Sequence, residues 1–308
     1  MFMNRINGSL VVNFVLILFF NFNVRGQEYS EDIYELYLRT GFDKACEYSL
    51  SEKLDSSILY CEKSLDLGLL PEVFIVHPDL KNLREDTLYS KNLNELLYAK
   101  YLGDNPNISN SSVGFELFKL YAKDQKTRTL SKYMDVFFSN EKVVLSVEEH
   151  NIEKKQLIMS MVTIIEEHGW LGYSQVGKKS GDAQFYVIQH SYPEDKLIQK
   201  YLPMLINSSI LEEADKINAA KMIDRYLFQV KKVQIYGTQI ICKSDESVRK
   251  CYLVPILDEK NVDSRRKTLG LASIAEYCLK FGFEYIPHEK QLKIKSRYQK
   301  MHFLDILN

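Results

Sequence analysis

Apolar residues recur at helical spacing through most of the chain, which predicts a mainly α-helical protein. The first helices are expected within 34–51 and at 54–67, where Gly68 would end the second. Further helices are expected at 115–134, 148–168, 181–190, 195–207, 212–230, 262–269 and 273–281. The helix at 181–190 is apolar almost all round, so we expect it to be buried among the others.

One β-hairpin is predicted within this helical pattern. Residues 233–242 and 251–257 alternate or run apolar on either side of the polar loop 243–250, which is typical of two antiparallel strands. In a regular strand, Tyr236 and Gln239 would lie on opposite faces. Gly237 favours a β-bulge, which would let these two side chains converge.

The N-terminal segment 1–26 predicts a signal peptide. Arg5 precedes an apolar run at 10–22, and Val24-Arg25-Gly26 offers the small or medium residues that a signal peptidase reads. The run is shorter than the roughly 20 apolar residues of a transmembrane helix. A cleaved signal is therefore favoured, and an uncleaved membrane anchor is the alternative. We therefore expect an exported protein, periplasmic or secreted, that begins at Gln27 and has no stable membrane anchor after cleavage.

The rest of the chain divides into two predicted units. Residues 27–102 form a helical unit, and residues 113–285 form a helical domain that carries the hairpin. The polar, turn-forming stretch 103–112 predicts a linker between them. The end of the chain, 286–308, is predicted to be a basic, amphipathic tail.

Charge and cysteine content narrow the function classes. The formal net charge is -1, so no general attraction for nucleic acid is expected. Five cysteines leave at least one unpaired, and none has a metal-ligand spacing. Two disulfides, Cys46–Cys61 and Cys242–Cys251, and buried free thiols are equal alternatives. We expect no metal and no cofactor.

Polar dipeptides interrupt the apolar pattern of two predicted helices, at Gln189-His190 and at Asp224-Arg225. Adjacent residues on a helix point about 100° apart, so Asp224 and Arg225 cannot simply satisfy each other. A buried polar group without a partner costs roughly 1–3 kcal/mol. We therefore predict that another element or a ligand supplies the partners, and the hairpin segment 234–239 is the nearest source.

Part of the N-terminal unit resembles a tetratricopeptide-repeat hairpin. The resemblance covers 45–50 and 55–68, with Ser57, Cys61 and Ser64 where the second helix would meet the first. A lone repeat cannot bury its own face, so it should dock on the part of the chain that comes after it. The resemblance implies that these helices hold a protein partner.

The segment 77–84 resembles the stretch that often trails such repeats in bacterial proteins. His77 stands beside Pro78 with no other histidine nearby. We therefore predict that His77 is a turn residue rather than a metal ligand.

The motifs between 115 and 281 resemble a bacterial family known only as a domain of unknown function. Its pattern is Asp-Gln…Arg, Gly-Trp-Pro, Gln-His, Asp-Arg, Gln-x-Tyr-Gly-Thr-Gln and a final Arg before Gly-Leu. The matching positions are Asp124, Gln125, Arg128, Gly169, Trp170, Gln189, His190, Asp224, Arg225, Gln234, Tyr236, Gly237, Thr238, Gln239, Arg265 or Arg266, Gly270 and Leu271. Leu171 departs from the pattern, because the family has proline there. The resemblance implies that these polar positions belong together, and it implies no reaction.

Two hypotheses of function remain open. The main one is a binding or scaffold protein whose polar cluster is a structural network or takes a small polar or anionic ligand. Its binding residues would be Asp124, Gln125, Arg128, Gln189, Arg225 and Gln239. The alternative is a metal-free acid–base hydrolase in which His190 transfers protons, Asp224 orients it and Tyr236 donates a hydrogen bond. No Gly-x-Ser-x-Gly nucleophile motif is present.

Overall fold

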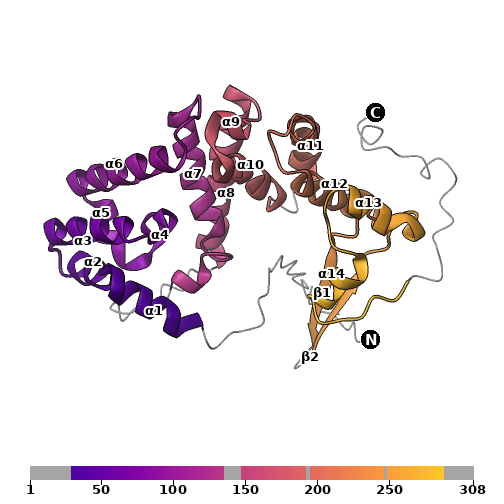
Figure 1. The fold of residues 1–308 in the computed structure, drawn as a ribbon, viewed down its shortest axis with the longest axis horizontal. Helices are drawn as coiled ribbons and strands as arrows, with labels where there is room; N and C mark the ends of the chain where they lie inside the picture. Colours follow the sequence, from indigo (N-terminus) through magenta and orange to yellow (C-terminus); the bar gives the residue numbers. More distant parts are fainter. Residues whose placement is uncertain (1–28, 135–146, 192–194, 246–247, 288–308) are drawn as a thin grey trace, which may run out of the picture.

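The computed structural model describes residues 29–134, 147–191, 195–245 and 248–287. This part of the chain is mainly helical and carries one two-stranded antiparallel sheet, which confirms the prediction of a mainly α-helical protein with one β-hairpin (Figure 1). The predicted signal peptide 1–26 and nearly all of the tail 286–308 lie outside the described residues. Within the described ranges, no helix is both long enough and apolar enough to cross a membrane.

The N-terminal helices surround a core of their own. They are α1 (Tyr29–Thr40), α2 (Phe42–Leu50), α3 (Leu54–Asp66), α4 (Pro71–Val76), the 3-10 helix η1 (Pro78–Leu80), α5 (Lys81–Glu85) and α6 (Thr87–Asp104). Helices α2 and α3 pack together, and Ser57, Cys61 and Ser64 are fully buried. The Ser57 hydroxyl donates to the Ala45 carbonyl at 2.8 Å, which fixes the spacing of the two helices.

Helix α7 (Ser111–Gln125) contributes to both hydrophobic cores. Phe115 and Phe118 pack with the N-terminal helices, whereas Leu117 packs with the C-terminal ones. The expected linker 103–112 spans the end of α6, a short connection and the start of α7. The amides of Ser109 and Asn110 donate to carbonyls of α9 (Tyr173–Val176), so this connection is fastened to the C-terminal part.

The helix expected at 115–134 is shorter than its apolar pattern suggests. Helix α7 ends at Gln125, and the 3-10 helix η2 (Ser131–Tyr133) comes after a turn. The amides of Arg128 and Leu130 both donate to the Gln125 carbonyl at 3.0 Å, which closes the helix end.

Helix α10 (Lys178–Gln189) is the centre of the C-terminal part. It contacts α7, α8 (Val147–His168), α9, α11 (Asp195–Ile210) and α12 (Lys216–Lys231). Ala183, Phe185, Val187 and Ile188 are all buried, as expected for a helix that is apolar almost all round. Figure 1 shows α7, α8 and α10 between the N-terminal helices and the α11–α12 pair.

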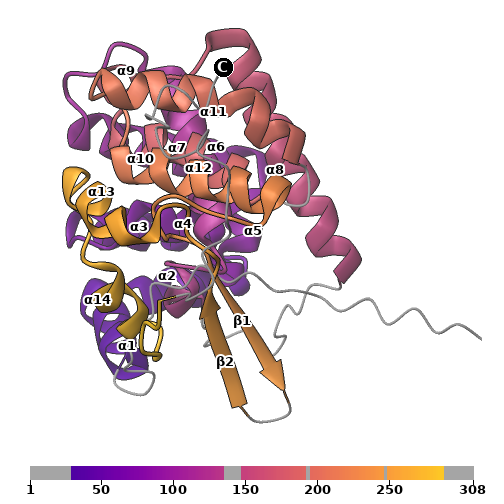
Figure 2. The ribbon, with the colours of Figure 1, turned by 90° about the vertical axis from the view of Figure 1, so that its right-hand side faces the viewer.

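The hairpin consists of β1 (Ile240–Asp245) and β2 (Val248–Leu253), and it extends away from the helices in Figure 2. Cys242 lies opposite Cys251, and a disulfide joins them. Cys46 and Cys61 are buried free thiols, so only one of the two pairs considered from the sequence is formed. The 3-10 helix η3 (Glu259–Asn261), α13 (Val262–Thr268) and α14 (Ile274–Leu279) come after the hairpin.

The first strand begins at Ile240, later than the predicted residue 233. Residues 233–239 form a loop, although Gln234 makes an isolated bridge to Ile256. Gly237 adopts a φ of 72°, a left-handed conformation that breaks a strand. A Cβ at this position would lie 2.5 Å from Ile274 Cδ1, so any other residue would force that buried side chain to shift.

Candidate functional site

A carboxylate–imidazole pair joins α7 to α10. His190 caps the C-terminus of α10, and its Nδ1 lies 2.9 and 3.0 Å from the two carboxylate oxygens of Asp124 near the end of α7. Tyr186, one turn earlier, stacks on the imidazole with ring centroids 6.2 Å apart. The Asp124 carboxylate and the Tyr186 ring therefore fix the orientation of the imidazole. Among the described residues, none hydrogen-bonds its Nε2, which is the nitrogen left to meet a ligand.

Neighbours on and after α7 hold the Asp124 carboxylate in place. Gln125 Nε2 donates to Asp124 Oδ2 at 2.7 Å, and the Thr129 hydroxyl donates to Gln125 Oε1 at 2.8 Å. Arg128 Nη1 donates to the Asp124 carbonyl at 3.2 Å. Four of the predicted site residues, Asp124, Gln125, Arg128 and His190, thus lie together.

The charges around this pair favour an ionised Asp124 beside a neutral His190. Burial alone would raise the pKa of the Asp124 carboxyl, but His190, Arg128 and Gln125 outweigh it and lower the pKa below 3.8. Burial lowers the pKa of His190 below 6.5, and the charges of Arg128 and Arg225 lower it further against the opposing effect of Asp124. At neutral pH we therefore assign the Nδ1–H tautomer, donating to Asp124. The His190 side chain is 12% exposed, so solvent reaches it.

Asp224 has a different role from the one expected for it. This residue of α12 is fully buried, and its carboxylate accepts hydrogen bonds from the amides of Ile235, Tyr236 and Thr238 at 2.7 to 2.9 Å. The Thr238 hydroxyl adds another at 2.9 Å. Burial raises the pKa of Asp224, and these donors oppose the rise. In the described structure the carboxylate beside His190 is that of Asp124, whereas Asp224 holds the loop before the hairpin.

Two arginines hold the same loop from its carbonyl side. Arg265 donates to the Ile235 carbonyl through Nε at 3.2 Å and Nη2 at 3.0 Å. Arg266, which is 1% exposed, donates through Nη1 to the Tyr236 carbonyl at 2.7 Å. Its guanidinium carbon lies 4.8 Å from the centre of the Tyr277 ring. Both arginines, rather than one of them, therefore belong to the network that fixes this loop.

Side chains inside the loop complete its hydrogen bonding. Gln234 Oε1 accepts from the Gln239 amide at 2.7 Å, and Gln234 Nε2 donates to the Gln239 carbonyl at 3.1 Å. Tyr236 contributes its backbone to the network, and burial raises the pKa of its phenol to about 12. The Tyr-Gly-Thr-Gln motif thus builds a rigid loop.

Two of the predicted binding residues keep an unused acceptor. Gln189 is 3% exposed and Gln239 is 2% exposed, and the Oε1 atom of each is buried without a hydrogen-bond partner among the described residues. Gln239 Nε2 donates to the Lys221 carbonyl at 3.3 Å. Exchanging the nitrogen and oxygen of this side-chain amide would place Gln239 Oε1 against the Lys221 carbonyl oxygen, so the amide keeps its orientation. A buried acceptor of this kind costs roughly 1–3 kcal/mol unless a ligand or water donates to it.

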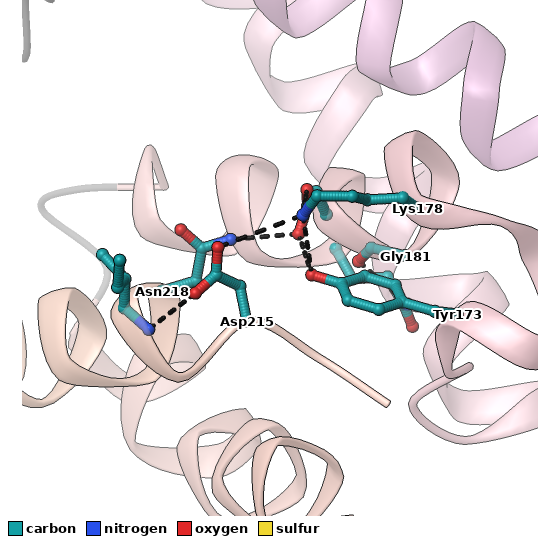
Figure 3. Close-up of polar contacts among 8 residues, drawn as sticks. Tyr173, Lys178, Gly181, Asp215 and Asn218 are labelled. Carbon is teal, nitrogen blue, oxygen red and sulfur yellow. Dashed lines mark hydrogen bonds and ion pairs between the residues drawn. The ribbon is translucent and has the colours of Figure 1, made fainter. Parts of the chain in front are cut away.

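A third polar cluster, which we did not predict from the sequence, joins α9, α10 and α12 (Figure 3). The Tyr173 hydroxyl and Asn218 Nδ2 donate to the same Asp182 oxygen at 2.6 and 3.0 Å. Lys178 pairs with the other oxygen at 2.9 Å. Gly181 leaves room for the Tyr173 ring, because a Cβ there would lie 2.7 Å from it. The four-residue spacing of Lys178 and Asp182 was the only signal in the sequence, and it is common on solvated helices.

Comparison with known proteins places these residues in one family domain. The family model of DUF6624, a family of unknown function, matches residues 116–286. That range includes every predicted site residue from Asp124 to Gln239, and it confirms the resemblance to a domain of unknown function. No curated protein and no solved structure matches the chain.

Proposed function

Since the chain belongs to DUF6624, a family of unknown function, we propose a function from the geometry of its own residues: the domain binds a small anionic ligand beside His190. The observation that carries this proposal is the His190–Asp124 pair beside Arg128, whose Nη1 donates to the Asp124 carbonyl. The charges of Arg128 and Arg225 both act on His190, whereas Asp124 is the carboxylate hydrogen-bonded to it. The positive charge of Arg128 would attract an anion that binds beside the His190 ring.

The residues around His190 also suit such a ligand in shape and hydrogen bonding. A guanidinium presents a planar fork of donors that matches a carboxylate or phosphate. The unused acceptor of Gln189, the residue before His190, favours a ligand that carries a donor as well, such as a hydroxyl or amino group. We therefore assign the ligand to the class of small polar anions.

We further propose that the protein is exported and that its N-terminal helices bind a protein partner. The apolar run at 10–22 supports export, and the Cys242–Cys251 disulfide fits an oxidising compartment. The tetratricopeptide-like pattern supports a partner surface. Leu38, Leu59, Leu67 and Leu88 are large apolar side chains exposed on these helices, which is consistent with a partner docking there.

Calorimetric titration tests the anion site. The chain from Gln27 onward is titrated with inorganic phosphate and with acetate, at constant ionic strength set with chloride. We expect saturable binding of at least one of them, and at least about tenfold weaker binding in Arg128→Gln and His190→Gln, which corresponds to about 1.4 kcal/mol. The exposed Arg39→Gln is the matched control and should bind like the wild type. Absence of binding by the wild type, or equal weakening by Arg39→Gln, would contradict the proposal.

A second candidate function is acid–base hydrolysis by His190, with Asp124 rather than Asp224 as the orienting carboxylate. The observation in its favour is that Asp124 fixes Nδ1 and leaves Nε2 for proton transfer. No serine, threonine or cysteine side chain of the described residues hydrogen-bonds His190, so a water molecule would be the nucleophile. The test is hydrolysis of p-nitrophenyl acetate, which should fall at least about 100-fold in Asp124→Asn. A rate that His190→Gln leaves unchanged would exclude this function.

A further inference from the structure

A thiol, an imidazole and a carboxylate meet inside the N-terminal helices. Cys46 lies in α2, His77 stands between α4 and η1, and Asp79 lies in η1. One ligand atom from each residue lies within 4.8 Å of the other two. All three residues are at most 1% exposed. This set lies apart from His190, so it is independent of the anion site proposed above.

The spacing of the first two ligand atoms matches metal coordination. Cys46 Sγ lies 3.7 Å from His77 Nδ1. In a tetrahedral zinc site, a Zn–S bond of about 2.3 Å and a Zn–N bond of about 2.0 Å place sulfur and nitrogen about 3.5 Å apart. The Asp79 carboxylate, within 4.8 Å of both atoms, needs only a small side-chain movement to complete a three-residue set.

The histidine is held in the form that can bind a metal. Its Nδ1 accepts a long hydrogen bond from the Asp79 amide at 3.3 Å, so this nitrogen carries a lone pair, and a metal would take the place of that hydrogen bond. Arg84 Nη1 donates to the His77 carbonyl at 2.7 Å, and the Phe42 ring meets the imidazole edge-on at 5.1 Å. These contacts fix the backbone and the ring, as outer neighbours do in metal sites.

From this geometry we propose that Cys46, His77 and Asp79 form a binding site for a divalent transition metal. Thiolate, imidazole and carboxylate together favour Zn²⁺ over Mg²⁺ or Ca²⁺, which prefer oxygen ligands. The sequence did not predict this set, because Cys46 and His77 are 31 residues apart. His77 was interpreted as a turn residue, and it also has that role, since it caps η1.

Cobalt titration of the chain from Gln27 onward tests the site. After treatment with a chelator and removal of the chelator, Co²⁺ is added and the thiolate-to-cobalt absorption is recorded. We expect about one Co²⁺ per chain with a thiolate band, displaced by Zn²⁺. Cys46→Ser should lose the band, and Asp79→Asn should weaken Co²⁺ binding at least about tenfold.

The matched controls are Cys61→Ser and Cys278→Ser, which remove the other buried thiols and should keep the band. If Cys46→Ser does not fold, the wild-type spectrum decides alone. A folded wild type with no thiolate band at saturating Co²⁺ would overturn the proposal. A band that persists in folded Cys46→Ser would do the same, as would a band lost only in one of the controls.

Discussion

Asp124 and His190 are 66 residues apart in the sequence, and their side chains lie within 2.9 Å of each other where α7 packs on α10. The contact makes a histidine at a helix end into an oriented imidazole with one nitrogen engaged. Asp224, the other candidate carboxylate, is committed to the amides of the loop before the hairpin. The candidate residues therefore divide into a site beside His190 and a network that fixes this loop.

The lowered pKa of His190 predicts an acid-sensitive contribution to stability. The folded protein takes up a proton on His190 only below pH 6.5, whereas the unfolded chain does so near 6.5. Stability from this group is therefore complete above that pH and is lost as the pH falls towards the folded-state pKa. Asp124, with a pKa below 3.8, stays ionised in this range.

His190→Gln removes the titration and keeps a donor for Asp124. Between about pH 7.5 and about pH 5.5, the wild type should lose more stability than the variant. Thermal melts of both proteins at these two pH values provide the measurement. A wild type that is stabilised relative to the variant on acidification would mean that the folded-state pKa of His190 is raised rather than lowered.

Replacing the two carboxylates should separate the two groups of residues. Asp224→Asn places an amide NH₂ among backbone N–H donors, so we expect a loss of about 3 kcal/mol or more in the free energy of unfolding. Asp124→Asn loses fewer hydrogen bonds and should cost less. Urea denaturation of both variants measures the difference. Equal losses of unfolding free energy in the two variants would argue against separate roles for Asp124 and Asp224.

Glycine substitutions measure how tightly the loop is packed. Gly237 and Gly270 have nearly the same φ, 72° and 69°, so alanine at either position costs about 1–2 kcal/mol of backbone strain. Only at Gly237 would the added Cβ meet a neighbour, at 2.5 Å from Ile274 Cδ1. Gly237→Ala should therefore be about 1–3 kcal/mol more destabilising than Gly270→Ala in denaturant unfolding. Equal losses of stability in the two variants would show that the loop is not packed tightly against Ile274.

Export and the disulfide are tested in one experiment. The full chain is expressed in a bacterial host, the thiols are alkylated under denaturing conditions, and intact mass is measured. We expect a chain that begins at Gln27, with Cys242 and Cys251 protected and the other cysteines modified. An intact Met1 together with a modified Cys242 and Cys251 would argue for a reducing compartment.

The helical part of the fold was predictable because its signal is local. The apolar pattern identified a buried helix at 181–190, and α10 (Lys178–Gln189) is that helix, with its start three residues earlier. The predicted helix starts too late because Lys178, in the first turn of α10, pairs with Asp182 rather than with the core. The periodic pattern of apolar residues shows which face of a helix is buried, but it says little about where the helix begins or ends.

The loop at 233–239 could not be predicted from periodicity. Its alternating pattern resembles a strand, but the backbone groups of residues 235–238 bond mainly to side chains from distant elements instead of to a second strand. Asp224 comes from α12, and Arg265 and Arg266 come from α13. The choice between Asp124 and Asp224 as the partner of His190 depended in the same way on packing between distant helices, which residue spacing does not encode.

The most direct test of the proposed function is the nuclear magnetic resonance spectrum of the His190 ring during phosphate titration. Without phosphate, we expect the Nδ1–H tautomer of His190, with a pKa below 6.5. Bound phosphate should shift the His190 signals saturably and raise this pKa, because an anion favours the imidazolium, and Arg128→Gln should weaken the response at least about tenfold. Signals from His190 that do not move at high phosphate, in a folded protein whose His190 titrates near 6.5, would contradict the account.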